Sequence, residues 1–76
     1  MYSYNISKFA DNNAFQKACR LIESRLSAVE KEKLLEDVDG TQIQIYDTAN
    51  GEIKVVNDYE VDAVYVDSDI NLDKIV

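Results

Sequence analysis

The side chains best able to do chemistry in this 76-residue chain are its fifteen carboxylates, several of which recur at regular spacing. Asp58, Glu60 and Asp62 alternate with other residues, so in an extended strand they would project from one face about 7 Å apart. The row could continue beyond the strand through Asp67, Asp69 and Asp73. Its charge density would be comparable with that of a DNA strand, which carries roughly one charge per 3.4 Å. The spacing therefore predicts a binding surface for a basic partner.

Two short segments carry partial metal-site or catalytic patterns. Residues 67–73 resemble the opening of a calcium-binding EF-hand loop, but Leu72 stands at the sixth position, where that family needs glycine for a sharp turn. Residues 37–41 resemble the nucleophile motif of haloacid-dehalogenase-type phosphatases, although that motif follows a buried strand and this segment follows a charged helical stretch. We therefore predict no metal site and no catalytic residue.

The remaining reactive residue types are few. Cys19 is the single cysteine, and histidine is absent, so the commonest general base near neutral pH is missing. Cys19 falls on an apolar helical stripe, where we expect it to be a core residue. A chain this short has little room for both a core and a catalytic cleft. We expect a non-enzymatic protein without a cofactor and, because no disulfide or long apolar run is encoded, a cytoplasmic one.

Tyrosine supplies five of the seven aromatic residues. Tyr46 and Tyr65 lie in predicted strands, and they would be candidate interface anchors if the fold leaves them exposed, since tyrosine is enriched at binding hot spots.

The elements that must position these side chains begin with a short strand, Met1 to Ser7, in which Tyr2, Tyr4 and Ile6 share one face. Residues 11–13 supply helix-start chemistry, and Asn13 with Gln16 has the spacing of a capping box. A helical apolar stripe follows, made of Phe15, Ala18, Cys19, Ile22, Leu26 and Val29. A second capping-box spacing at residues 27–30 allows either a second helix to about Asp37 or one continuous helix.

The pattern then changes to the two-residue period of strands. Residues 41–48 place Ile43 and Ile45 on one face, and Asn50-Gly51 predicts a type I′ hairpin turn. A returning strand with Ile53 and Val55 and a last strand over residues 59–67 complete the pattern. We predict a single α+β domain over residues 1–76: an N-terminal strand, one long or two short helices, then a three-stranded antiparallel meander with the helices packed on one sheet face.

Charge is divided unevenly along the chain. Residues 1–35 carry about +2, whereas residues 36–76 hold eleven acidic side chains against Lys54 and Lys74, which gives the net charge of −7. Such a surface repels nucleic acid and anionic membranes and favours basic protein surfaces. We therefore expect no direct binding to either. A simpler interpretation is that the acidity serves solubility alone.

Size and charge together favour a protein that binds and blocks a basic, nucleic-acid-binding surface of another protein. A phage or mobile-element inhibitor of the anti-restriction or anti-CRISPR type, acting as a DNA mimic, is the most concrete form of this hypothesis. Two alternatives remain open: an immunity or antitoxin protein that neutralises a cognate toxin, and a homo-oligomeric accessory protein, for example a homodimer.

Overall fold

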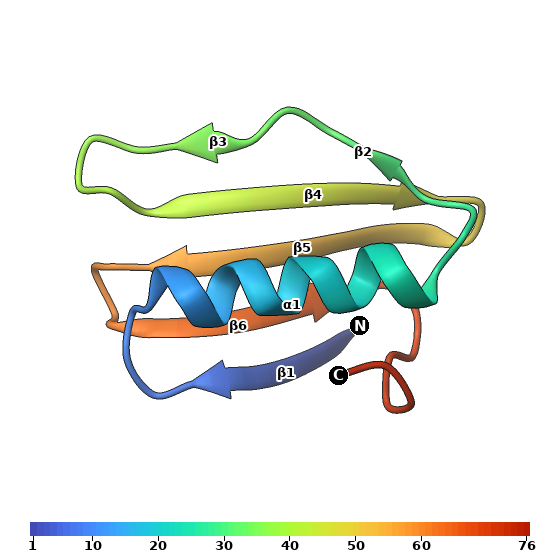
Figure 1. The fold of residues 1–76 in the computed structure, drawn as a ribbon, viewed down its shortest axis with the longest axis horizontal. Helices are drawn as coiled ribbons and strands as arrows, with labels where there is room; N and C mark the ends of the chain where they lie inside the picture. The colour runs from blue at the N-terminus through green and yellow to red at the C-terminus, as the bar shows by residue number, and fades with distance from the viewer.

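One helix packs on one face of a six-stranded antiparallel sheet in the computed structural model, which describes residues 1–76 (Figure 1). The elements are β1 (Tyr2–Ser7), α1 (Asn12–Arg25), β2 (Glu30–Lys31), β3 (Leu35–Glu36), β4 (Gln42–Thr48), β5 (Gly51–Asp58) and β6 (Ala63–Ser68). The strand order is β1-β6-β5-β4-β2, and β3 also pairs with β4. The predicted α+β class is confirmed. The sheet has six strands where an N-terminal strand and a three-stranded meander were predicted, and there is one helix, not two.

The N-cap of α1 is Asp11, two residues before the Asn13 that the capping-box spacing suggested. Asp11 is the N-cap, because its carboxylate accepts a hydrogen bond from the Asn13 amide at 2.9 Å. Asn13 lies inside the helix, so the predicted Asn13–Gln16 capping box is wrong. The apolar stripe buries Phe15, Ala18, Cys19 and Ile22, and the helix ends where Leu26 turns to an extended backbone. The helix is not long and apolar enough to cross a membrane.

The predicted second helix is wrong, since residues 27–37 contain the short strands β2 and β3 instead. Both pair with β4, and the Glu32 amide donates to the Ile45 carbonyl at 2.9 Å. The buried Gln44 side chain adds a hydrogen bond to the Glu32 carbonyl at 2.6 Å. These contacts satisfy the outer edge of β4, and such pairing outweighs the weak local helix preference.

The strands β4, β5 and β6 are consecutive antiparallel neighbours, but two details of their turns differ from the prediction. Thr48 pairs with Gly51, so the hairpin loop consists of Ala49 and Asn50, and of these residues Gly51 alone has a positive φ, 140°. The type I′ turn centred on Asn50-Gly51 is therefore wrong. The last strand begins at Ala63 rather than residue 59, because residues 59–62 form the turn.

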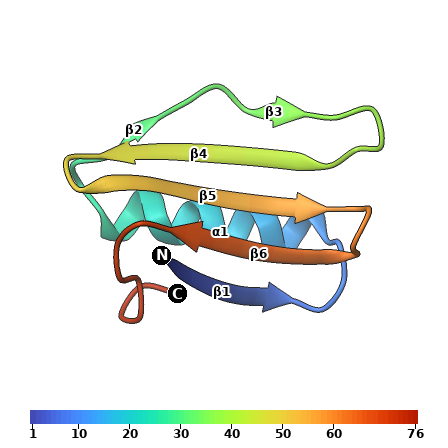
Figure 2. The same cartoon turned by 180° about the vertical axis from the view of Figure 1, so that it is seen from behind.

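The core lies between α1 and one face of the sheet. Ten buried side chains form it: Phe15, Ala18, Cys19 and Ile22 from α1, Tyr46, Ile53, Val55, Val64 and Val66 from the strands, and Leu72 from the C-terminal segment. Leu72 is held in place because its amide donates to the Tyr4 hydroxyl at 2.7 Å. The sheet's other face carries no helix, as Figure 2 shows with α1 behind the strands.

Candidate protein-binding surface on the open sheet face

The open face is the side of the sheet that α1 leaves uncovered (Figure 2). Side chains alternate along a strand, and Gln44, Tyr46, Ile53, Val55, Val64 and Val66 are buried on the helix side. Their neighbours in sequence therefore form the open face: Ile43, Ile45 and Asp47 on β4, Glu52, Lys54, Val56 and Asp58 on β5, and Ala63, Tyr65 and Asp67 on β6. The predicted shared face of Ile43 and Ile45 is thus on the open side.

An apolar row crosses the middle of the open face. Leu35 pairs with Ile43, Ile43 with Val56, and Val56 with Tyr65, so these four side chains lie side by side across four strands. Val56 is only 3% exposed although no helix covers it, because its neighbours enclose it. Leu35 remains 49% exposed. This row provides the apolar contact area that a protein partner could cover.

An acidic row crosses the same face near the β4–β5 hairpin. Glu30 pairs with Asp47, and Asp47 pairs with Glu52, which places three carboxylates at one register position on neighbouring strands. Strands lie about 4.8 Å apart, and like charges directly opposite each other reduce stability. The interaction with Asp47 raises the pKa of Glu32, with Glu30 and Glu52 contributing the same direction. We name Glu30, Glu32, Asp47 and Glu52 the acidic row.

No cation neutralises the acidic row. The protein contains one ion pair, between Lys31 Nζ and Glu23 Oε2 at 3.1 Å, and it lies on the helix side of β2. Lys54 is the single basic residue of the open face, and it pairs in register with Asp67 without forming an ion pair. The carboxylates of the acidic row therefore have no ion-pair partner within the chain.

The predicted row of Asp58, Glu60 and Asp62 does not exist as one strand face. Asp58 ends β5 and accepts hydrogen bonds from the amides of Glu60 (2.9 Å) and Val61 (3.2 Å), which shapes the turn. Asp62 has a φ of 58° and accepts a hydrogen bond from the Ala10 amide at 2.8 Å. These two carboxylates thus stabilise the turn and its contact with the β1–α1 loop, while Glu60 is exposed.

The predicted continuation of that row is also dispersed. Asp67 lies on the open face and accepts a hydrogen bond from Ser3 at 2.8 Å, whereas Asp73 is exposed in the C-terminal segment. Asp69 binds the Glu52 amide at 2.9 Å and packs so closely on Gly51 that a Cβ there would lie 2.5 Å from its own. Of the six predicted carboxylates, the structure therefore brings Asp58 and Asp67 to the open face.

The two candidate tyrosine anchors have different environments. Tyr65 is partly exposed on the open face, and burial together with the nearby carboxylates of Asp58 and Asp67 raises its pKa. Tyr46 is fully buried on the helix side, so it lacks the exposure that an interface anchor needs and is not available to a partner. Its hydroxyl donates to the Glu23 carboxylate, and this hydrogen bond lowers the pKa of Glu23.

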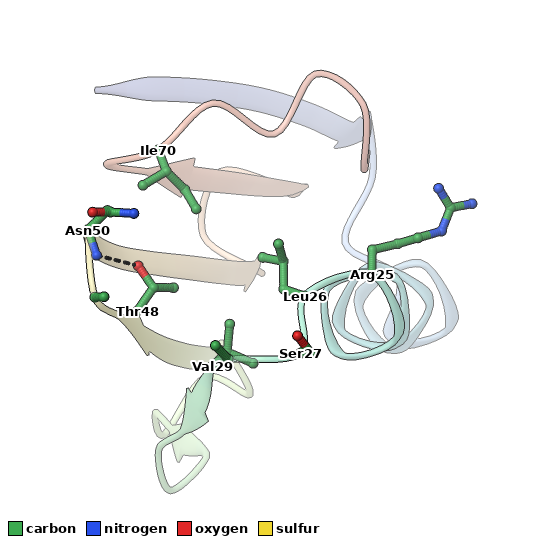
Figure 3. Close-up of a pocket in the computed structure, with 9 residues that line it drawn as sticks. Arg25, Leu26, Ser27, Val29, Thr48, Asn50 and Ile70 are labelled. Atoms are coloured by element: carbon green, nitrogen blue, oxygen red, sulfur yellow. Dashed lines mark hydrogen bonds between the residues drawn. The ribbon is translucent and has the colours of Figure 1, made fainter.

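The hollows of the surface offer no comparable set of side chains. The one in Figure 3, of about 280 Å³, lies between the end of α1 and the β4–β5 hairpin, and Leu26, Val29 and Ile70 line it while Arg25 points away. A second hollow of about 300 Å³ lies between α1 and β2, where Arg20, Glu23 and Lys31 are at its edge. The second hollow also contains Cys19, one helical turn from Glu23. That carboxylate already accepts the Tyr46 hydroxyl and pairs with Lys31, and burial raises the pKa of the Cys19 thiol, so the thiol is not activated.

The acidic row could not be predicted from the sequence, because its members are far apart along the chain. Only the pairing of β2 with β4 brings Glu30 to Asp47, whereas the helical spacing of residues 27–37 predicts no strand there. Asp47 and Glu52 flank the hairpin loop, and a loop of Ala49 and Asn50 would have predicted that these two carboxylates face each other. Comparisons with protein-family models, with curated proteins and with solved structures found no match to this chain.

Proposed function

We propose that this protein is a non-enzymatic inhibitor that covers a basic, nucleic-acid-binding surface of a target protein with its open face. The observation that carries the proposal is an acidic row without ion-pair partners on the same uncovered sheet face as a partly exposed apolar row. Acidic residues kept only for solubility need not lie opposite one another, where they reduce stability. A gain in binding would explain that arrangement.

The proposed interface divides the work between the two rows. The acidic row would pair with Arg and Lys side chains that otherwise hold phosphates, and its spacing of about 4.8 Å resembles the roughly 3.4 Å per charge of a nucleic-acid strand. Tyr65 and Leu35 would supply the contact area from which water is removed. Asp58 and Asp67 extend the acidic surface along β5 and β6. An inhibitor of a restriction or CRISPR nuclease would use such a surface as a DNA mimic.

The test compares two triple variants that change the net charge equally. Glu30→Gln/Asp47→Asn/Glu52→Gln removes three charges of the acidic row, and Glu36→Gln/Glu60→Gln/Asp73→Asn removes three exposed charges elsewhere. A partner is captured from host lysate at low salt, purified, and its affinity for labelled DNA is measured with and without the inhibitor. We expect the acidic-row variant to lose competition with DNA by at least about tenfold, and the control variant to keep it.

Two results would contradict the proposal. One is a partner whose binding to nucleic acid is unchanged when the protein is bound, and the other is an acidic-row variant that competes as well as the wild type. Capture of a toxin whose activity is blocked would favour the immunity or antitoxin alternative.

A further inference from the structure

The two edges of the sheet are protected very differently. At one edge, β2 and β3 contain two residues each and carry Glu30, Lys31 and Glu36, and short charged strands are a usual protection against pairing with another chain. At the other edge, β1 is six residues long and is the one strand without a charged side chain. Its outer side has no neighbour in the sheet (Figure 1). No strand therefore pairs with this edge of β1, and its nearest neighbour is the C-terminal segment, which contacts Tyr4 and ends beside the start of β1 (Figure 1).

An apolar groove lies beside this edge, on the helix side of the sheet. It has a volume of about 280 Å³ and is lined by Ile6, Ala14, Lys17, Ala18, Leu21 and Val76, of which five are apolar. A strand added to β1 would place alternate side chains over this groove, next to Ile6. Main-chain pairing at an edge combined with side-chain pockets is the usual way in which a sheet accepts another strand.

We propose that the strand that binds there is β1 of a second copy of this chain, in antiparallel orientation. Tyr2, Tyr4 and Ile6 share the helix side of β1, so pairing centred on Ser3 or Tyr4 brings matching faces of the two strands together. Residues 2–5 pair regularly with β6 and contain no bulge, and the one irregularity of β1 follows Asn5.

Charge selects this edge over the other surfaces for self-association. Contact between two open faces would bring two acidic rows together, whereas the residues of β1 are neutral. Strands paired antiparallel in one sheet present the same face, so the dimer would carry both open faces on one side. The acidic surface available to a target would then be twice as long, although the dimer itself does not depend on the proposed function.

The test is the mass in solution of the full chain, measured by sedimentation equilibrium at low salt. We expect the weight-average mass to rise from 8.7 kDa towards twice that value as the concentration increases, with a dissociation constant on the order of 10–100 µM, which corresponds to about −7 to −5.5 kcal/mol. Ser3→Lys/Asn5→Lys places like charges along the paired strands and should weaken the dimer at least about tenfold. Gln16→Lys/Ser24→Lys adds the same charge on exposed positions of α1 and should leave it unchanged.

Hydrogen exchange of the wild type provides a second measurement that needs no variant. The amides of β1 that point outward should exchange more slowly at high than at low protein concentration, while exchange in β2 and β3 stays the same. A strict monomer at 1 mM, which is about tenfold above the expected range, would overturn the proposal. A dimer that survives Ser3→Lys/Asn5→Lys, or one that protects the open face instead of β1, would overturn it as well.

Discussion

Glu23 joins three elements through the carboxylate of its partly exposed side chain. Tyr46, which is fully buried on β4, donates its hydroxyl hydrogen to Glu23 on α1, and Lys31 on β2 forms the ion pair from the other side. The hydrogen bond from Tyr46, and secondarily Lys31, lowers the pKa of Glu23. A carboxylate with a lowered pKa in the folded state stabilises the fold above its unfolded pKa, and this stabilisation disappears as the pH falls through the folded value.

The change Glu23→Gln should therefore reduce stability at neutral pH and have less effect in acid. Because the Glu23 side chain is 39% exposed, solvent weakens its interactions, and we expect a loss of about 1 kcal/mol in the free energy of unfolding at pH 7. Urea unfolding at pH 7 and at pH 3 measures the difference. Glu60→Gln, in the exposed turn, is the control and should cost little at either pH. An equal loss for Glu23→Gln at both values would show that the charge is not what matters.

At the scale of elements, the start of α1 depends on a single side chain. Asp11 caps the helix through the Asn13 amide, so Asp11→Ala should lower the free energy of unfolding by about 1 kcal/mol. Asn13→Ala is the matched control, because Asn13 lies within the helix and alanine has the higher helix propensity. Thermal and urea unfolding of both variants measure the difference. The helix start would be misassigned if Asn13→Ala were the more damaging change.

Sequence patterns predicted those elements whose own residues determine them. The first strand, α1 and the three strands from β4 to β6 each have a clear period, and they appear within a few residues of the expected bounds. Residues 27–37 have helical spacing too, yet they contain β2 and β3, which pair with β4. Without them, the backbone N–H and C=O groups on the outer edge of β4 would have no partner in the sheet. Such long-range pairing has no local signal. Tertiary context decided this segment.

The acidic row could not be predicted for a similar reason, because the position of the hairpin loop decides which residues of β4 and β5 face each other. A loop centred on Asn50 and Gly51 would pair Asp47 with Lys54, an attractive contact. The loop of Ala49 and Asn50 pairs Asp47 with Glu52 instead, and the acidic row results. The sequence predicted acidity in the sheet half of the molecule but not the strands on which it gathers. Moving the loop by one residue changes the register by two, so the side chains keep their faces and change their partners across the strands.

At the scale of the whole molecule, the acidic row should make the isolated protein less stable than it could be. Glu30→Gln/Asp47→Asn/Glu52→Gln removes two opposed like-charge pairs, so we expect it to raise the free energy of unfolding by about 1 kcal/mol at low salt. Added salt screens the same repulsion and should stabilise the wild type more than the variant. The neighbouring Asp47 raises the pKa of Glu32, so the charged form of Glu32 is also unfavourable in the folded state. This repulsion is relieved when Glu32 takes up a proton as the pH falls through its raised pKa.

Urea unfolding at low and high salt checks this prediction. The control Glu36→Gln/Glu60→Gln/Asp73→Asn changes the net charge equally and should gain less, because these exposed side chains lie in three separate parts of the chain. An equal gain for both variants would mean that net charge, and not the opposed pairs, sets the cost.

The pairing of β1 with β6 also has a consequence for how the chain folds. Ser3 and Asp67 face each other across 64 residues of sequence, so the sheet cannot be completed on one edge until the last strand is available. The chain loses the entropy of closing that long loop before the contacts between β1 and β6 can stabilise it. Proteins dominated by such non-local pairing typically fold in milliseconds to seconds. During synthesis, the first strand to leave the ribosome has to wait for the last. The open-face strands β4 and β5 are joined by a two-residue loop and can pair much earlier.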